Sequence, residues 1–138
     1  MEANTFFLKI ISANRQFMGE RCKAVILPEH DGQEEILAHH ENIVIALVPG
    51  ELRYKLSESD EWVSAVVGNG FARIVNNRVT ILVESAERPE EIDIARAREA
   101  KERAEEQLRQ KQSIHEYYHS RSSLARAMAR LKVTSRYR

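Results

Sequence analysis

The first 84 residues of the chain consist of short apolar and β-branched runs, separated by polar turns at intervals of about 8 to 12 residues. This spacing is typical of a β-sandwich or barrel, in which each run forms a strand with one buried face. The predicted strands are residues 6–11, 22–27, 43–48, 51–56, 61–67, 71–75 and 79–83. The turn signals between them include Asp31-Gly32 and Asn76-Asn77, which tolerate positive φ, and Pro49-Gly50, which fits a type II turn.

The pattern changes at Pro89, after which no Pro or Gly occurs and Ala, Glu, Lys, Arg and Gln dominate. That composition favours α-helix. Proline fits a first helical turn and the acidic residues after it favour a helix N-terminus, so a first helix is predicted over about residues 90–110. Ser113, with Glu116 three residues later, forms a capping-box pattern. A second helix is therefore predicted to begin there, after a break at residues 111–113.

Each predicted helix has an apolar stripe at three- or four-residue spacing. The stripes are Ala97, Ala100, Ala104 and Leu108 on the first helix, and Ile114, Tyr117, Leu124, Met128 and Leu131 on the second. Two such helices can pair as an antiparallel hairpin. A buried alanine contributes about 0.8 kcal/mol per carbon, so we expect a marginally stable hairpin that a partner or ligand can move. The predicted fold class is a β-sandwich domain at residues 1–88 followed by an antiparallel two-helix hairpin at residues 89–138.

Composition and charge agree with one modest core and a small appendage. The 138 residues include 21 basic and 21 acidic side chains, but residues 1–88 have 9 basic against 13 acidic and residues 89–138 have 12 against 8. The neutral total gives no argument for nucleic acid as a partner. No apolar run approaches the roughly 18 residues of a membrane span. The single cysteine, Cys22, is expected to be a buried strand residue in a reducing compartment.

No residues in the sequence form a convincing catalytic or metal-binding cluster. His39 and His40 are adjacent, and adjacent residues of a strand point to opposite faces of the sheet. Gly68 and Gly70 lack the helix and lysine that follow the glycines of a phosphate-binding loop. We therefore expect neither an active site nor a metal site.

The last predicted helix is strongly basic. From residue 113 onward the chain has one acid, Glu116, and six basic residues: Arg121, Arg126, Arg130, Lys132, Arg136 and Arg138. A cationic amphipathic helix suits an acidic protein groove or, less well, nucleic acid or lipid headgroups, and it can also be a solvated face.

Asp93 and Arg96 on the first helix also leave two interpretations open. They can form a surface ion pair worth a few tenths of a kcal/mol. Alternatively, together with Arg126 and Arg130 on the facing helix, they can form a nucleotide site in which guanidinium groups match phosphate oxygens.

Four segments of the chain support a family assignment. They read GQEEILAHHENIVIALVPGELR from Gly32, GNGFARIVNNRVTILVESAE from Gly68, EIDIARAREAKERAEEQL from Glu91 and SLARAMARL from Ser123. In order and spacing, over nearly the whole chain, they resemble the epsilon subunit of bacterial F-type ATP synthase. The chain departs from that family at Glu35, where glycine is usual, and at His40-Glu41-Asn42, where His-Ala-Pro is usual.

The resemblance implies a non-catalytic, peripheral subunit of the rotating central stalk, on the cytoplasmic face of the bacterial cell membrane, that couples proton flow to ATP synthesis. Its sandwich would bind the gamma subunit and the c-ring, at a contact expected to include Glu29, His30, Asp31, Gly32 and His40. Its hairpin would extend towards the alpha and beta subunits and block ATP hydrolysis, with Arg121, Arg126, Arg130 and Lys132 against beta. Neither nucleic-acid binding nor direct membrane insertion is expected.

The segment from Ile92 to Ala97, Ile-Asp-Ile-Ala-Arg-Ala, matches the motif with which bacillus-type members bind ATP in the folded hairpin. The resemblance thus implies ATP as a regulatory ligand, with no cofactor required. The residues expected to bind it are Glu87, Ile92, Asp93, Arg96, Ala97, Arg103, Arg126 and Arg130. His119 stands where another basic residue is expected, which should weaken binding.

Overall fold

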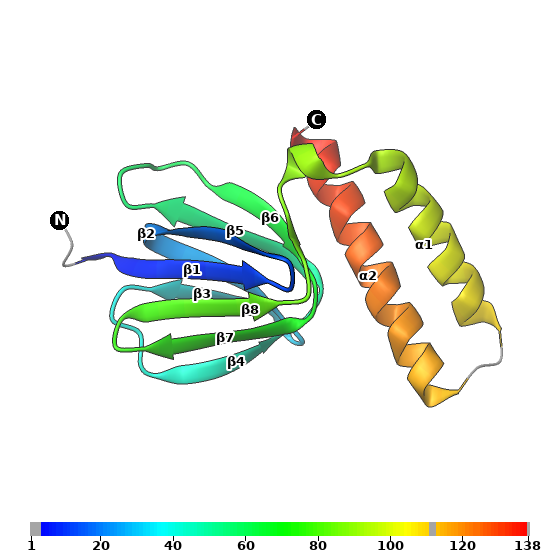
Figure 1. Ribbon diagram of the computed structural model, residues 1–138, viewed down its shortest axis with the longest axis horizontal. Coiled ribbons are helices and arrows are strands. Elements are labelled where there is room, and N and C mark those ends of the chain that lie inside the picture. The colour runs from blue at the N-terminus through cyan, green and yellow to red at the C-terminus, as the bar shows by residue number, and fades with distance from the viewer. Residues whose placement is uncertain (1–3, 111–112, 138) are drawn as a thin grey trace.

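The computed structural model describes residues 4–110 and 113–137, which form a β-sandwich followed by two antiparallel helices (Figure 1). The strands are β1 (Phe6–Ser12), β2 (Arg15–Glu29), β3 (Gly32–Leu37), β4 (Ile43–Leu47), β5 (Gly50–Leu56), β6 (Val63–Val67), β7 (Gly70–Val75), β8 (Arg78–Val83) and β9 (Ala86–Glu87). A 3₁₀ turn, η2 (Pro89–Glu91), leads to the helices α1 (Ile94–Arg109) and α2 (Ile114–Tyr137). The predicted fold class is confirmed.

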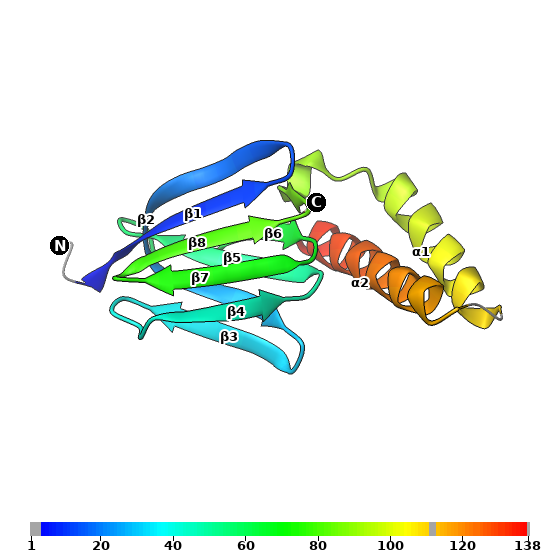
Figure 2. The ribbon, with the colours of Figure 1, turned by 60° about the horizontal axis from the view of Figure 1, so that its bottom comes forward.

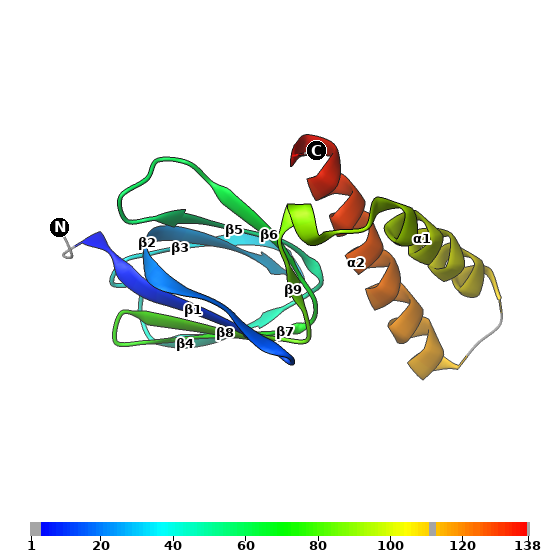
Figure 3. The same ribbon diagram turned by 45° about the horizontal axis from the view of Figure 1, so that its top comes forward.

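Two layers of strands form the sandwich, and the long strand β2 belongs to both (Figure 3). One layer has the order β4-β7-β8-β1 and continues into the first part of β2, with β1 and β8 as parallel neighbours. The other layer contains β3, the second part of β2, β5, β6 and β9. The pairing of β2 with β5 shifts register between Cys22 and Ala24, and a bulge of this kind bends a strand from one layer towards the other.

The structure adds three strand segments to the predicted set: the first part of β2, β3 and β9. Strand β3 has the sequence GQEEIL, whose acidic residues have low strand propensity. It is an edge strand paired with β2, and Ile36 is its one buried residue. Charged residues are common on edge strands because they discourage pairing with another chain. Tertiary pairing therefore outweighs the local propensity of this segment.

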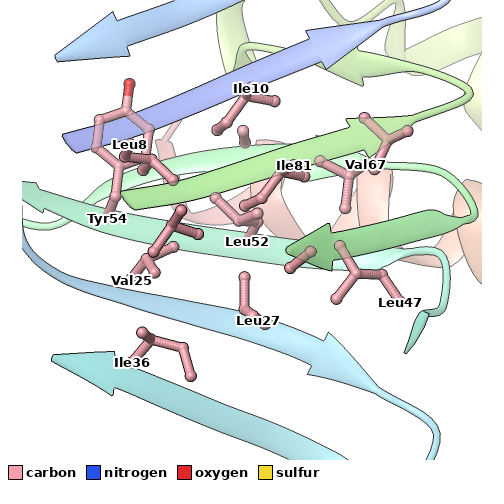
Figure 4. Close-up of a cluster of buried hydrophobic side chains, with 14 of the residues drawn as sticks. Leu8, Ile10, Val25, Leu27, Ile36, Leu47, Leu52, Tyr54, Val67 and Ile81 are labelled. Carbon is pink, nitrogen blue, oxygen red and sulfur yellow. The ribbon is translucent and has the colours of Figure 1, made fainter. Parts of the chain in front are cut away.

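Side chains from both layers meet in one core (Figure 4). Leu8 and Ile81 come from the layer of β1 and β8, and Leu27 and Leu52 come from the facing layer. Cys22 is buried as predicted, and burial raises the pKa of its thiol to about 12. All buried members of this core lie at residues 6–86, so the sandwich core is built without the hairpin.

The predicted turn chemistry holds at two of three positions. Asn76 and Asn77 have φ of 48° and 63°, and Gly32 has φ of 129°. Gly50 does not have positive φ, so the predicted type II turn at that position is wrong. Glycine fits at this position because a larger residue would crowd Pro28: a Cβ on Gly50 would lie 3.0 Å from the Cβ of Pro28.

Side-chain caps set where both helices begin. The Asp93 carboxylate accepts a hydrogen bond from the Arg96 backbone N–H at 3.1 Å, so α1 begins after Asp93 and not near residue 90 as predicted. The acidic residues before it form η2 instead. Ser113 caps α2 as predicted, its hydroxyl accepting from the Glu116 N–H at 3.2 Å. Residues 111–112 of the predicted break lie outside the described residues.

Small side chains pack the two helices together. Ala97 and Ala104 of α1 are buried, as its stripe predicts. The predicted stripe of α2 is wrong: Ile114, Tyr117 and Met128 are exposed, and Leu124 and Leu131 are only half-buried. Ser120 and Ala127 are buried instead, and the Ser120 hydroxyl reaches Gln107 of α1 at 3.3 Å. The physical reason is that α2 lies between α1 and the sandwich and needs small side chains to approach both.

Helix α2, rather than α1, makes the main contact with the sandwich (Figures 1 and 2). It packs on β5, β6 and η2. Val66 of β6, Ile92, Ala129 and Val133 form a small apolar cluster that is separate from the sandwich core. Burying a valine or isoleucine side chain contributes about 1.5–3 kcal/mol, and ordering the hairpin costs conformational entropy. The apolar contact alone therefore holds the hairpin only weakly.

The linker before α1, residues 88–93, contacts the start of β2. Glu91 Oε1 accepts hydrogen bonds at 2.9 Å from Arg15 Nη2 and from the Arg88 backbone N–H. Both guanidinium groups also lie over the Phe17 ring, at 5.2 Å for Arg15 and 4.3 Å for Arg88. The hydrogen bonds from Arg15 and from the Arg88 backbone lower the pKa of Glu91 to about 2. A hairpin that leaves the sandwich can therefore pivot beyond Glu91 while the linker stays in place.

Glu91→Gln should weaken this linker contact in a pH-dependent way. The folded-state pKa of Glu91 lies below its ordinary value of 4.5, so its stabilisation is complete above that pH and is lost as the pH falls towards 2. Urea unfolding at pH 7 should show a loss of about 0.2–1 kcal/mol, the range for partly exposed pairs. The loss should shrink as the pH approaches 2. Glu90→Gln is the matched control, and a pH-independent difference would contradict the prediction.

Candidate functional site

Two adjoining cavities lie along the hairpin, one beside the linker and one between the two helices. The first has a volume of about 290 Å³ and is lined by Glu87, Glu91, Ile92, Asp93, Arg96, Ala97, Glu99, Ala100, Arg103 and Arg130. These include seven of the eight residues predicted to bind ATP. The eighth, Arg126, lines the second cavity. The fold thus brings the predicted set together from the linker and from both helices.

The second cavity is cationic. It has a volume of about 240 Å³ and is lined by Ala100, Arg103, Ala104, Gln107, His119, Ser123, Arg126 and Arg130. It shares Ala100, Arg103 and Arg130 with the first cavity. Its lining, among the residues that the structure describes, includes three arginines and a histidine but no acidic residue, whereas the first cavity has acidic, basic and apolar residues. The second cavity therefore suits an anion, and the first suits a polar molecule with an apolar face.

The arginines of α2 are paired with glutamates of the sandwich edge and the linker. Arg130 Nε donates to Glu87 Oε1 at 2.6 Å, and Arg126 Nη1 lies 3.8 Å from Glu84 Oε1. The two arginine side chains are 25% and 23% exposed. Charge–charge interactions are stronger at such half-buried positions than in bulk water. An anion in the second cavity would therefore compete with these glutamates for the same guanidinium groups.

Asp93 and Arg96 do not form the ion pair that was one interpretation of the sequence. The Asp93 carboxylate caps α1 by accepting a hydrogen bond from the backbone N–H of Arg96, and it does not pair with the Arg96 guanidinium group. Both residues line the first cavity. The cap therefore fixes the Asp93 carboxylate at the cavity wall.

Several lining residues were not predicted. They are Glu91, Glu99 and Ala100 in the first cavity, and Ala100, Ala104, Gln107 and Ser123 in the second. His119 also lines the second cavity, at a position where the resemblance implied a basic residue. The signal that was available is helical spacing: Ala100, Arg103 and Gln107 recur at three- and four-residue steps and so share one face of α1.

The residues predicted to contact beta do not share one face of the folded hairpin. Arg121 and Lys132 are exposed, and the Arg121 guanidinium lies 5.6 Å from the centre of the Tyr117 ring. Arg126 and Arg130 are half-buried and face the glutamates and cavities described above. All four are available to one partner only if the hairpin leaves the sandwich.

The residues predicted for the c-ring and gamma contact fall at two ends of β3. Glu29 ends β2, Gly32 begins β3, and His30 and Asp31 form the exposed turn between them. His40 follows the other end of β3, and a strand of six residues spans roughly 20 Å. The structure therefore does not gather these residues into one cluster.

The described residues include neither a metal-binding cluster nor a helix suited to a membrane. Among them, no three His, Cys, Asp or Glu side chains are grouped so that they could hold a metal ion. Within residues 4–110 and 113–137, no helix is long and apolar enough to cross a membrane.

The sequence matches two protein families that divide the chain near residue 89. Residues 5–89 match the beta-sandwich domain of the ATP synthase delta/epsilon chain, and residues 90–135 match its long alpha-helix domain. Among the relatives is the ATP synthase epsilon chain of Ruminiclostridium cellulolyticum, with 46% identity over 97% of this chain and 98% of its own. The ATP synthase epsilon chain of Caldanaerobacter subterraneus is 41% identical over 96% of each chain.

Solved structures show the same fold. A chain in the cryo-EM structure of the Euglena gracilis mitochondrial ATP synthase, which contains OSCP, F1 and the c-ring, superposes with a TM-score of 0.77 at 23% identity. The match covers 91% of this chain and 78% of that one. Because both family domains match in order over nearly the full length, the chain belongs to the ATP synthase delta/epsilon chain family, and it is a non-catalytic subunit of that assembly rather than an enzyme itself.

Proposed function

We propose that this chain is a regulatory rotor subunit that couples rotation to ATP synthesis and restrains ATP hydrolysis through its hairpin. The sandwich binds gamma and the c-ring at the cytoplasmic face of the bacterial membrane. The hairpin alternates between the folded state described above and an extended state that contacts alpha and beta. ATP binds the folded state, and the main support for this is the cationic cavity, where both helices contribute basic side chains.

The cationic cavity is suited to the triphosphate tail of ATP. Arg103 belongs to α1, while Arg126 and Arg130 belong to α2. Guanidinium groups bind phosphate oxygens through paired, charge-assisted hydrogen bonds. A triphosphate that contacts all three arginines would therefore tie the two helices together.

The first cavity is suited to the uncharged part of the nucleotide. Ile92 and Ala97 offer apolar contact for a planar base. The carboxylates of Glu87 and Asp93 are acceptors for base N–H groups or ribose hydroxyls. Together the two cavities reach the range of about 300–1,000 Å³ that is typical of small-molecule sites.

ATP would act on the hairpin by mass action. The site is made of the linker and both helices, so it exists only while the hairpin is folded. A ligand at ten times its dissociation constant stabilises the state it binds by about 1.4 kcal/mol, which shifts an equilibrium about tenfold. Such a shift matters here because the apolar contact of the hairpin with the sandwich is small.

Inhibition would use some of the same side chains. Arg126 and Arg130 face the sandwich in the folded hairpin, and extension would release them for an acidic surface on beta. ATP and beta would therefore compete for two arginines, while Arg121 and Lys132 are exposed already.

The double substitution Arg126→Ala with Arg130→Ala should abolish most ATP binding. Isothermal titration of the wild-type chain with ATP, with and without Mg²⁺, should give a saturable heat. The double variant should bind at least tenfold more weakly, because two of the three guanidinium groups are lost. Arg98→Ala is the control, since Arg98 is exposed and lines neither cavity. No heat from the wild-type chain at millimolar ATP would reject the nucleotide site.

Removing residues 89–138 should raise ATP hydrolysis by the reconstituted ATP synthase several-fold. The sandwich keeps its entire core in this variant, so it should still copurify with gamma. Comparison of hydrolysis rates with the full-length and truncated chains measures the restraint. An unchanged rate of ATP hydrolysis, in assemblies that contain the truncated chain, would contradict the inhibitory role.

A further inference from the structure

The outward face of β5 contains a buried carboxylate that has no part in the proposed nucleotide site. Leu52 and Tyr54 point into the sandwich core, so the alternation of a strand turns Glu51 and Arg53 outwards. Glu51 is nevertheless only 7% exposed. Because α2 covers this face, the burial of Glu51 depends on the docked hairpin.

The partners of Glu51 come from β6 and from the last turn of α2. Arg136 forms an ion pair with Glu51 Oε2, and the Ser64 hydroxyl donates to the same oxygen at 2.7 Å. The Tyr137 hydroxyl lies 3.1 Å from Ser64 Oγ. Burial acts to raise the pKa of Glu51, but the hydrogen bonds from Arg136 and Ser64, with the charges of Arg136 and Arg53, hold it below its usual value. Glu51 is therefore ionised in the docked state at neutral pH.

We propose that Glu51 is a positioning residue that locks α2, and with it the nucleotide site, in the docked register. We call Glu51, Ser64, Arg136 and Tyr137 the Glu51 latch. The inference rests on the proposed movement of the hairpin. Arg130 lies six residues before Arg136 on the same helix, roughly 9 Å along its axis, so the latch also sets where Arg130 faces.

The two charges of the latch are not equivalent. Docking without Arg136 would bury the Glu51 carboxylate against α2 without its cationic partner, which is strongly unfavourable. Docking without Glu51 leaves Arg136, whose side chain is 40% exposed and can be hydrated. The latch therefore acts mainly by making other docking registers of α2 unfavourable, because they would bury Glu51 without Arg136. It adds less to the stability of the observed register. A second substitution at Glu51 should then reverse the effect of a substitution at Arg136.

Docking can be measured on the full chain with two spin labels, at Glu58→Cys in the β5–β6 loop and Glu102→Cys on α1. Both positions are exposed, and the native Cys22 is buried. Arg136→Gln should raise the ratio of undocked to docked chains at least tenfold. Adding Glu51→Gln should remove most of that increase, and Glu51→Gln alone should change the ratio less than threefold. Arg136→Lys keeps a cation for Glu51 and should stay near wild type.

Glu84→Gln is the matched control, because Glu84 also pairs with α2 but its side chain is 58% exposed. It should change the ratio less than twofold. Circular dichroism of each variant shows whether the sandwich is intact, and Arg136→Gln changes no residue of the sandwich core. The proposal is overturned if Glu51→Gln does not lessen the effect of Arg136→Gln, or if the wild-type chain has no docked population.

Titration of the same variants with ATP separates this inference from the proposed nucleotide site. Arg136→Gln should weaken apparent ATP binding by the same factor by which it depletes the docked state, and Glu51→Gln should restore it. If the ratio of undocked to docked chains changes as expected but the chain does not bind ATP, the latch is supported and the nucleotide site is rejected. ATP binding that none of these substitutions alters would reject the latch alone.

Discussion

The docking of α2 against the outward face of β5 and β6 is the contact on which the arrangement of the hairpin depends. Helix α1 packs on α2 and has little contact of its own with the sandwich. The apolar part of the docked surface is small, with Val66 and Val133 at its centre. Beside this apolar part, ion pairs join Glu51, Glu84 and Glu87 to arginines of α2. If α2 leaves the sandwich, the first cavity loses the wall that Arg130 forms opposite Glu87, whereas the second cavity is lined by the two helices alone.

A polar docking surface of this kind favours reversible movement. If the hairpin leaves the sandwich, water can hydrate the separated charges. Little apolar surface becomes exposed, because the sandwich retains a core that includes no hairpin residue. The hydrogen bonds of Glu91 would keep the start of the hairpin attached during the proposed movement. The small side chains between the helices have a related consequence, because each contributes little burial. Stability is therefore divided between a sandwich with a large core and a hairpin whose proposed movement would expose little apolar surface.

Sequence patterns identified most of the elements but not the contacts between them. Alternating apolar residues identified most strands, and the loss of Pro and Gly after residue 89 identified the helices. The buried face of α2 was missed because large apolar residues such as Met128 outweigh Ala127 in a periodicity argument, whereas a helix packed on two sides selects small residues. The pair of Glu51 and Arg136 joins residues 85 positions apart, and only the fold shows that they meet. The cavity residues that were predicted came from the family resemblance, since the spacing of Asp93 and Arg96 was also consistent with a surface ion pair.

Native-state hydrogen exchange, resolved by segment with mass spectrometry, tests most directly whether the hairpin opens as a unit from an intact sandwich. Amides of α1 and α2 should exchange with opening free energies well below those of β1 and β2. Saturating ATP should protect the helices and leave the strands unchanged. Equal protection of helices and strands, in the absence of ATP, would show that the hairpin and sandwich unfold together and that the hairpin does not open on its own.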